Sequence, residues 1–280
     1  MITRFAPSPT GPLHLGHASS ALTAHDLATS GGGTFLLRMD DIDRVRSRPE
    51  YEEQAFDDLA WLGLTWPEPV LRQSASGPRF WNAVDRLAAM GLTYPCRCSR
   101  SDIATAASAP QEGAPLHGPD GVVYPGTCRG RPMADYGDGD AIRLDMARAV
   151  AKLGPLPGFE ETGPLRPGIH ALDAAALIRG VGDVVIARKG HGLAYHLSVV
   201  VDDAAQHITL VTRGMDLFDA TPIHVLLFAL LDLPIPDFHH HRLIRDEHGK
   251  RLAKRDDARA IARYRAEGRT PADIREMLRL

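Results

Sequence analysis

Two histidines stand three residues apart where a helix is predicted to begin. The sequence His14-Leu15-Gly16-His17 follows a loop of prolines and glycine, so both imidazoles share one helix face at the end where unpaired N–H groups favour phosphate. Imidazoles in this place can donate hydrogen bonds to a phosphoryl group whose charge grows in a transition state. Gly16 leaves space for a flat ligand against the backbone. The alternative is a pair of histidines that only stabilises the fold.

A basic loop near the C-terminal end offers a second set of phosphate-binding groups. Residues 249–255 read Gly-Lys-Arg-Leu-Ala-Lys-Arg, and lysine carries a compact charge on a flexible stem. A mobile loop with Lys254 near its tip would bring that charge onto a leaving pyrophosphate. The alternative is an ordinary solvated loop.

Three cysteines form the third group. Cys96 and Cys98 are two residues apart, and Cys128 follows in the same glycine- and proline-rich stretch. This pattern suits a reduced compartment and a metal better than a disulfide framework. A structural zinc site needs four ligands, and His117 and Tyr124 are the candidates for the fourth. Chemistry alone favours His117, because imidazole is a common zinc ligand and a phenol is not. Zinc would stabilise a segment poor in apolar residues; the alternative is three unliganded thiols.

Strands and helices alternate in the parts of the chain that position these groups. The apolar pattern and its breakers predict strands at residues 2–6, 34–39, 183–188 and 208–212, and helices at residues 15–30, 49–62, 77–90, 221–231, 258–266 and 271–278. The apolar run at residues 197–201 fits neither period. The alternation predicts an α/β fold with a Rossmann-like, doubly wound parallel sheet, in which ligands bind outside the carboxyl ends of the strands.

The middle of the chain reads as an insertion. Residues 95–167 are rich in Gly, Pro, Ala and Ser, and a chain of 280 residues has room for one large domain or two modest ones. We therefore expect a split catalytic domain at residues 1–92 and 182–235 and an inserted zinc-binding subdomain at residues 93–181. The basic loop and short C-terminal helices would occupy residues 236–280.

The charge balance excludes a general polycation. The chain has 32 Lys and Arg against 35 Asp and Glu, a formal net charge of −3, so it is not drawn to nucleic acid at large. Residues 236–280 hold 12 basic and 8 acidic residues, which indicates either an anionic partner for this end or a solvated helical surface. No apolar run approaches a membrane span and no leader pattern opens the chain. We expect a cytoplasmic monomer with no membrane partner.

Further stretches extend the motifs into a family resemblance. They are residues 4–11 (Arg-Phe-Ala-Pro-Ser-Pro-Thr-Gly), 35–38 (Phe-Leu-Leu-Arg), 183–188 (Asp-Val-Val-Ile-Ala-Arg), 199–203 (Val-Val-Val-Asp-Asp) and 211–214 (Val-Thr-Arg-Gly). Together with residues 14–17 and 251–255 they resemble, in order and context, the catalytic domain of glutamyl-tRNA synthetases. The two short motifs are similar to the class I synthetase signatures called HIGH and KMSKS.

The length makes the chain resemble the shorter paralogues in that family, the glutamyl-Q tRNA(Asp) synthetases. Only about 25 residues follow the KMSKS-like loop, so we expect no anticodon-binding domain. The resemblance implies activation of L-glutamate with ATP and Mg²⁺ to glutamyl-adenylate. It also implies transfer of the glutamate to queuosine at the wobble position of tRNA(Asp), so the queuosine-carrying anticodon arm is the expected RNA partner.

The resemblance assigns roles to individual residues. The glutamate site would contain Arg4, Phe5, Ala6, Pro7, Ser8, Asp40, Tyr195 and Arg213. The ATP site would contain His14, Gly16, His17 and Lys254, and the two histidines and the lysine would be the catalytic residues. The paralogues have a tyrosine four residues before the last cysteine, so the zinc ligands would be Cys96, Cys98, Tyr124 and Cys128. Arginine suits carboxylate recognition because its planar fork binds both oxygens.

Three positions depart from the family pattern. Asp40 stands where the family has a glutamate that meets the substrate α-amino group, and Arg251 and Ala253 replace the first lysine and the serine of KMSKS. Two functions of other classes stay open: a non-catalytic RNA-binding paralogue, and a glutamyl transferase that loads a carrier protein or a small molecule. An ordinary glutamyl-tRNA synthetase is a further alternative within the family.

Overall fold

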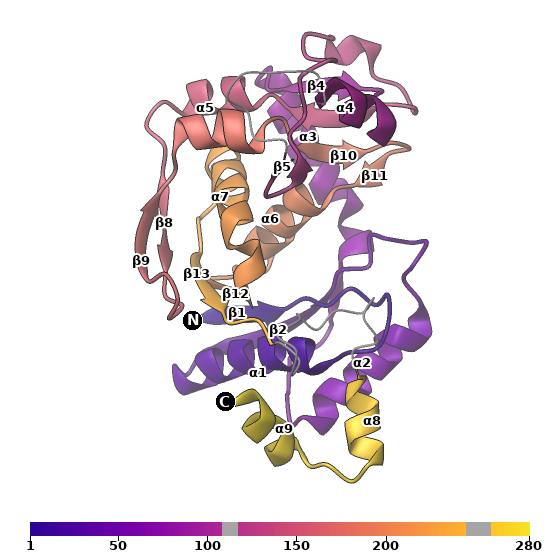
Figure 1. The fold of residues 1–280 in the computed structure, drawn as a ribbon, viewed down its shortest axis with the longest axis vertical. Coiled ribbons are helices and arrows are strands. Elements are labelled where there is room, and N and C mark those ends of the chain that lie inside the picture. Colours follow the sequence, from indigo (N-terminus) through magenta and orange to yellow (C-terminus); the bar gives the residue numbers. More distant parts are fainter. Residues whose placement is uncertain (108–116, 245–258) are drawn as a thin grey trace.

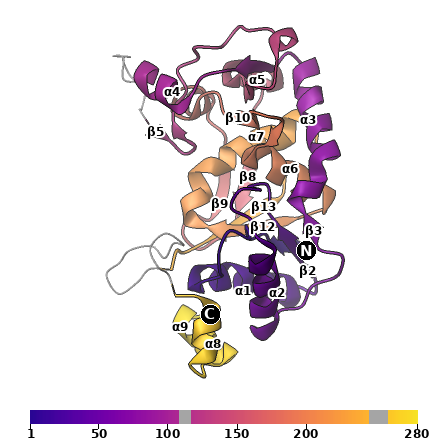
Figure 2. The ribbon, with the colours of Figure 1, turned by 90° about the vertical axis from the view of Figure 1, so that its right-hand side faces the viewer.

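The structure is a computed structural model that describes residues 1–107, 117–244 and 259–280 (Figures 1 and 2). Its helices are α1 (Leu15–Ser30), α2 (Pro49–Trp61), α3 (Gly77–Ala89), α4 (Arg100–Ala107), α5 (Met146–Leu153), α6 (Tyr195–Ala205), α7 (Thr221–Leu230), α8 (Ile261–Ala266) and α9 (Pro271–Leu278). Its strands are β1 (Ile2–Phe5), β2 (Thr34–Met39), β3 (Leu71–Arg72), β4 (Thr93–Cys96), β5 (His117–Gly118), β6 (Gly121–Val122), β7 (Ala141–Leu144), β8 (Gly158–Glu161), β9 (Gly168–Ala171), β10 (Val185–Arg188), β11 (Gly192–Leu193), β12 (Leu210–Gly214) and β13 (Asp237–His241). Among these residues no helix combines the length and apolar character of a membrane span.

A mostly parallel sheet crosses the middle of the molecule. β1, β2 and β3 pair in parallel, as do β12, β13 and β8. The two groups meet where the amide of Thr209 donates to the carbonyl of Ile2 at 3.0 Å. The spatial order is therefore β3-β2-β1-β12-β13-β8-β9, with β9 as an antiparallel edge strand. The expected doubly wound sheet is confirmed, and its strand order reverses between β1 and β12, where such sheets bind ligands.

Helices cover both faces of this sheet (Figure 1), α1 and α2 on one side and α6 and α7 on the other. The sequence of β2 shows why both faces are buried. Phe35 and Leu37 belong to the cluster formed with α1 and α2, while Leu36 between them packs against the cluster that contains Phe228 of α7. Successive strand side chains point to opposite faces, so an apolar strand needs cover on each.

The turn between α1 and β2 depends on glycine. A Cβ on Gly33 would lie 2.1 Å from the carbonyl oxygen of Met1, and that oxygen accepts a hydrogen bond from the amide of Thr34 at 2.9 Å. Gly32 adopts a φ of +64°, a conformation that favours glycine. The run Gly31-Gly32-Gly33 therefore lets β2 approach β1 closely enough to pair with it.

A second, antiparallel sheet has the order β11-β10-β7-β4. β10, which we expected in the parallel sheet, pairs with β7, with Val185 opposite Arg143. Conversely, β8 from the expected insertion extends the parallel sheet by pairing Glu161 with Phe238 of β13. β10 and β8 thus pair with strands across the expected limits at residues 92/93 and 181/182, because an apolar run identifies a buried strand but not the strand that pairs with it.

The ambiguous run at residues 197–201 lies inside α6. Every residue from His196 to Asp203 in this helix is buried, because α3 and α7 pack against it. A helix that is covered all round shows no amphipathic period.

The two C-terminal helices pack against the first helices of the chain. Ile261 of α8 and Ile274 of α9 join the cluster of α1 and α2. Arg275 pairs with Asp26 of α1 at 2.6 Å, and Arg265 pairs with Asp57 of α2 at 2.7 Å. Part of the basic excess at this end is therefore used in contacts within the chain.

We predict that α9 contributes to stability through one fully buried side chain. Ile274→Ala should lower the free energy of unfolding by about 2–4 kcal/mol, because it removes buried methyl groups and leaves a cavity. Met277→Ala on the same helix should cost less than about 0.5 kcal/mol, because Met277 is 47% exposed. Urea denaturation of both variants measures the difference, and equal effects would contradict this packing.

Candidate active site

A cavity opens where the strand order reverses, outside the carboxyl ends of β1, β2, β12 and β13. Most of the residues assigned to glutamate and ATP line it, and they come from segments far apart in the sequence: Arg4, Phe5, Ala6, Ser8, His14, Gly16, His17, Asp40, Tyr195 and Arg213. Pro7 is buried beside it, and its carbonyl accepts the amide of Asp40 at 2.9 Å. Lys254, Arg251 and Ala253 lie outside the described residues. The segment that contains them is flanked by Ile244, which lines the cavity, and by Ala260, which pairs with His14.

The two histidines of the HIGH-like motif cap α1 and each other. His14 Nδ1 accepts the amide of Gly16 at 3.1 Å, and His17 Nδ1 accepts the amide of His14 at 3.1 Å. Since each Nδ1 accepts, a neutral ring carries its proton on Nε2. The ring centroids are 3.8 Å apart, and a Cβ at Gly16 would come within 3.0 Å of His14 Cε1. This spacing therefore needs glycine and gives both rings a defined donor atom.

Asp203 at the end of α6 joins two arginines beneath the cavity. Its carboxylate accepts from Nε and Nη2 of Arg4 at 2.9 and 3.1 Å and from Nη1 of Arg38 at 2.6 Å. Arg38 Nε also donates to Asp40 at 2.7 Å. All four groups are buried, so two positive and two negative charges balance one another. The pattern at residues 199–203 belongs to the family resemblance, but its local sequence does not reveal this contact.

The two carboxylates of this network differ in their electrostatics. Burial would raise the pKa of Asp203, but Arg4 and Arg38 outweigh it and the pKa is lowered. Burial raises the pKa of Asp40 despite the neighbouring Arg38. Asp40 is therefore the carboxylate of the pair that is less well compensated, and it is also the one that lines the cavity.

Arg213 on β12 is held differently from the other two arginines. Its Nε, Nη1 and Nη2 donate to His240, His224 and Thr221 at 3.0, 2.9 and 2.7 Å. Within the part of the chain that the structure describes, no carboxylate forms an ion pair with it. Burial lowers its pKa, and Tyr195 beside it counteracts this effect. Arg213 thus presents a buried positive charge to the cavity with neutral partners on its protein side.

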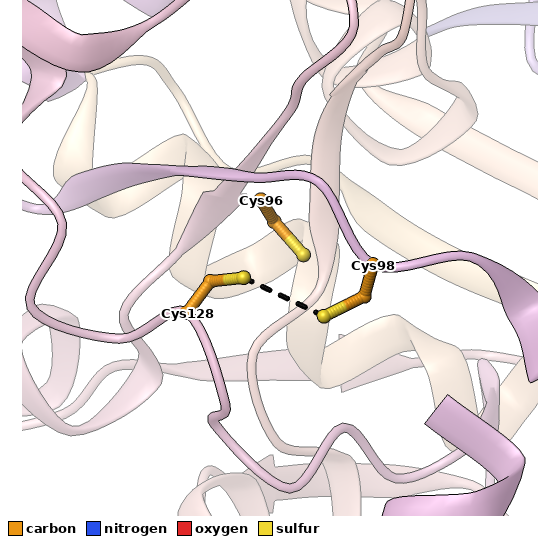
Figure 3. A group of neighbouring side chains, drawn as sticks. All are labelled: Cys96, Cys98 and Cys128. Atoms are coloured by element: carbon orange, nitrogen blue, oxygen red, sulfur yellow. Dashed lines mark hydrogen bonds between the residues drawn. The ribbon is translucent and has the colours of Figure 1, made fainter. Parts of the chain in front are cut away.

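The three thiols lie together away from this cavity (Figure 3). Cys96, Cys98 and Cys128 have sulfur atoms within 4.8 Å of one another, and Cys98 and Cys128 are 3.5 Å apart. The hydroxyl of Tyr124 is 3.4 Å from the sulfurs of both Cys96 and Cys98. His117 is an exposed residue of β5 and is absent from this group of ligand atoms. The three thiols could bind a metal, and the hydroxyl of Tyr124, not the side chain of His117, lies beside them.

Polar contacts also act on the thiol of Cys128. Burial would raise its pKa, but hydrogen bonds from the Tyr124 hydroxyl and the Arg97 amide lower it to about 7. A thiolate is the form that binds a metal. Within the cluster Cys128 is thus shifted toward the thiolate, whereas burial raises the pKa of Cys98 to about 11.

Comparisons with known proteins show the family of this chain. A family model described as tRNA synthetases class I (E and Q), catalytic domain, matches residues 1–116 and 175–280. A glutamyl-Q tRNA(Asp) synthetase of Rhodobacter capsulatus is 60% identical over the full length of both chains. This chain belongs to the glutamyl-Q tRNA(Asp) synthetase family. A relative of the same name from Nocardia farcinica is 41% identical over 98% of this chain and 82% of that protein.

Solved structures place this family member in the class I fold. A glutamate tRNA ligase from Elizabethkingia meningosepticum, solved in complex with its amino acid, has a TM-score of 0.70 and 25% identity over 91% of this chain. This chain spans 52% of that ligase. Methionyl-tRNA synthetase from Mycobacterium tuberculosis, bound by methionyl-adenylate, shares the fold alone, with a TM-score of 0.62, 11% identity, and coverage of 99% of this chain and 63% of that one. Members of the family are ligases, so this chain is an enzyme.

We predict that Asp203 is the most sensitive carboxylate of the site. Asp203→Asn should lower the free energy of unfolding by about 3–5 kcal/mol, because two buried guanidinium groups would lose their shared counter-charge. Asp26→Asn removes an ion pair that is partly exposed to solvent and should cost less than about 1 kcal/mol. Denaturant titrations of the two variants compare them, and a loss at Asp203 no larger than at Asp26 would contradict the buried network.

Proposed function

We propose that this protein activates L-glutamate with ATP and transfers it to queuosine at the wobble position of tRNA(Asp). The observation that carries the activation step is Arg213, a buried cation in the cavity whose direct protein partners are neutral. Burying a charge without a counter-charge is costly. A substrate carboxylate would supply the missing negative charge.

The cavity suits an amino acid with a side-chain carboxylate. Arg213 and Arg4 lie with Tyr195 around one end, and a guanidinium binds a carboxylate through two parallel hydrogen bonds. A neutral amide side chain would leave the buried charge of Arg213 uncompensated, which favours glutamate over glutamine. Asp40 would meet the α-ammonium group from the side of β2. Its pairing with Arg38 holds the shorter side chain in one orientation.

ATP would lie along the HIGH-like motif. His14 and His17 donate through Nε2 to the phosphates, and Gly16 allows the nucleotide to approach α1. A glutamate carboxylate oxygen attacks the α-phosphorus in line, the bond from that phosphorus to the bridging oxygen breaks, and pyrophosphate leaves. Mg²⁺ bound with ATP would neutralise phosphate charge. We assign Lys254 to the same phosphates, and the positions of Ile244 and Ala260 at the site support this assignment.

The transfer step forms an ester on the RNA. A hydroxyl of the queuosine ring attacks the carbonyl carbon of glutamyl-adenylate, its proton is released, and AMP leaves with the bonding electron pair. The relatives from Rhodobacter capsulatus and Nocardia farcinica, whose names specify glutamyl-Q and tRNA(Asp), support this acceptor.

Glutamate-dependent exchange of pyrophosphate into ATP tests the activation step. We expect exchange with glutamate and little with glutamine or aspartate. Arg213→Gln should lower kcat/KM for glutamate at least about 100-fold, because a charge-assisted contact is lost and a buried partner is left unpaired. Arg148→Gln, at an arginine on the exposed side of α5, is the matched control and should change it less than about twofold. Exchange that survives in Arg213→Gln would contradict the assignment.

The acceptor is tested separately with labelled glutamate. Queuosine-containing tRNA(Asp) should be labelled, and queuosine-free tRNA(Asp) and tRNA(Glu) should not. Labelling of tRNA(Glu) would identify an ordinary glutamyl-tRNA synthetase. Exchange without labelling of any RNA would favour the carrier or small-molecule transferase, and tRNA binding without exchange would identify a non-catalytic paralogue.

We assign a structural Zn²⁺ to Cys96, Cys98, Cys128 and Tyr124, because three sulfurs and a phenol surround one point and soft thiolates suit zinc. The protein should contain about one zinc per chain. Tyr124→Phe should weaken zinc binding at least about tenfold and lower the melting temperature, while His117→Ala should change neither. Elemental analysis and competition with a chelator measure these effects. Zinc loss in His117→Ala with full retention in Tyr124→Phe would reverse the assignment of the fourth ligand.

A further inference from the structure

Arg213 is held by two chains of hydrogen bonds, and each ends on a carboxylate from the segment that the family model does not match. In the first chain Arg213 Nε donates to His240 Nε2 at 3.0 Å, and His240 Nδ1 contacts the carboxylate of Glu161. Glu161 also accepts the amides of Gly163 and His240 at 2.7 and 2.8 Å. Its carboxylate therefore fixes the ring that faces Arg213.

The second chain is longer and reaches the inserted β5–β6 hairpin. Arg213 Nη1 contacts His224 Nδ1 at 2.9 Å, and His224 Nε2 contacts His196 Nδ1 at 3.0 Å. His196 Nε2 then contacts Asp120 Oδ1 at 2.8 Å. Both rings are buried, whereas the side chain of Asp120 is 43% exposed. Asp120, in the turn between β5 (labelled in Figure 1) and β6, thus connects this hairpin to α6 through His196.

The donors and acceptors allow only one direction for this second chain of hydrogen bonds. A guanidinium can only donate, so His224 Nδ1 must accept, and the proton of the neutral ring is on Nε2. That proton is donated to His196 Nδ1, which places the His196 proton on Nε2, facing the carboxylate of Asp120. Burial and then Arg213 lower the pKa of His224 well below its usual value, which agrees with a neutral ring. The carboxylate of Asp120 accepts at the far end and therefore stabilises the same tautomers of both histidines.

This arrangement differs from the direct pairing of Arg4 and Arg38 with Asp203. A carboxylate in contact with Arg213 would neutralise it and compete with the substrate. Two imidazoles and a hydroxyl fix its orientation and leave its charge to the ligand. The carboxylates of Glu161 and Asp120 are two and three hydrogen bonds away from Arg213, where they orient the imidazole rings.

We propose that Asp120, His196 and His224 are positioning residues for Arg213, and that the inserted hairpin in this way sets the affinity of the site for the substrate carboxylate. This inference rests on the proposed function, in which Arg213 binds glutamate. If Asp120 is removed, the Nε2–H of His196 loses its acceptor, and the tautomers of His196 and His224 that accept from the guanidinium lose part of their support. The binding site is then disordered without loss of any group that touches the substrate.

The test uses the full-length, metal-loaded protein in the pyrophosphate exchange assay. Asp120→Ala should raise KM for glutamate about tenfold, with kcat and KM for ATP unchanged within about threefold, because a binding contact is misplaced and the reacting atoms are not. Asp120→Asn keeps an acceptor oxygen and should stay within about threefold of the wild type. Asp138→Asn is the matched control, since Asp138 lies in the same inserted segment, its side chain 90% exposed.

A double-mutant cycle separates positioning from general stability. His196→Phe fills the volume of the imidazole ring but removes its hydrogen bonds to His224 and Asp120. It should therefore raise KM for glutamate by about the same factor as Asp120→Ala. Asp120→Ala added to His196→Phe should have no further effect, because the chain is already broken. Additive losses, or lower melting temperatures with an unchanged KM, would show a merely structural role.

The outcomes distinguish this inference from the proposed function. If KM for glutamate is unchanged in Asp120→Ala and the wild type shows normal exchange, the positioning role of Asp120 is overturned and the proposed function stands. If the wild type shows no exchange but binds glutamate in a calorimeter, the proposed function fails. The Kd of Asp120→Ala for glutamate then tests the positioning role in place of KM. A wild-type chain that does not bind glutamate overturns both.

Discussion

The contact of Asp203 with Arg4 and Arg38 is the interaction on which the rest of the site depends. It joins β1, β2 and the end of α6 at the point where the strand order reverses, and Arg4 also donates to the carbonyl of Thr212 on β12 at 3.2 Å. The sheet can open a cavity there only if the charges that line its floor are compensated. The buried ion network meets this condition within the protein.

The three buried arginines of the site therefore have two different roles. Arg4 and Arg38 have carboxylate partners in direct contact, and their charges help to assemble the strands. Arg213 has neutral partners in direct contact, and its charge is directed to the cavity. Neutral imidazoles make this possible because a histidine can accept from an arginine on one nitrogen and donate to a carboxylate on the other.

The inserted segment and the C-terminal helices both take part in this architecture. The insertion contributes the thiol cluster with Tyr124, the strand that extends the parallel sheet, and the carboxylates of Asp120 and Glu161. The C-terminal helices return the chain to α1, where the amide of Ile261 donates to the carbonyl of Leu13 at 2.8 Å. Segments outside the cavity thus place the HIGH-like motif and Arg213 relative to one another.

The sequence by itself determined the features that depend on near neighbours. The helix at residues 15–30, the strand at residues 34–39 and the paired histidines that cap α1 follow from residues within four positions of each other, where side-chain periodicity and capping act. Chemical type alone also indicated that the three cysteines form one group. Only the tertiary structure decided that β10 pairs with β7, that Asp203 lies between Arg4 and Arg38, that Tyr124 rather than His117 lies beside the thiols, and that Asp120 supports Arg213. Nearly all of these contacts join residues tens to hundreds of positions apart. A local pattern shows that a group must be buried or paired, but not which partner the folded chain brings to it.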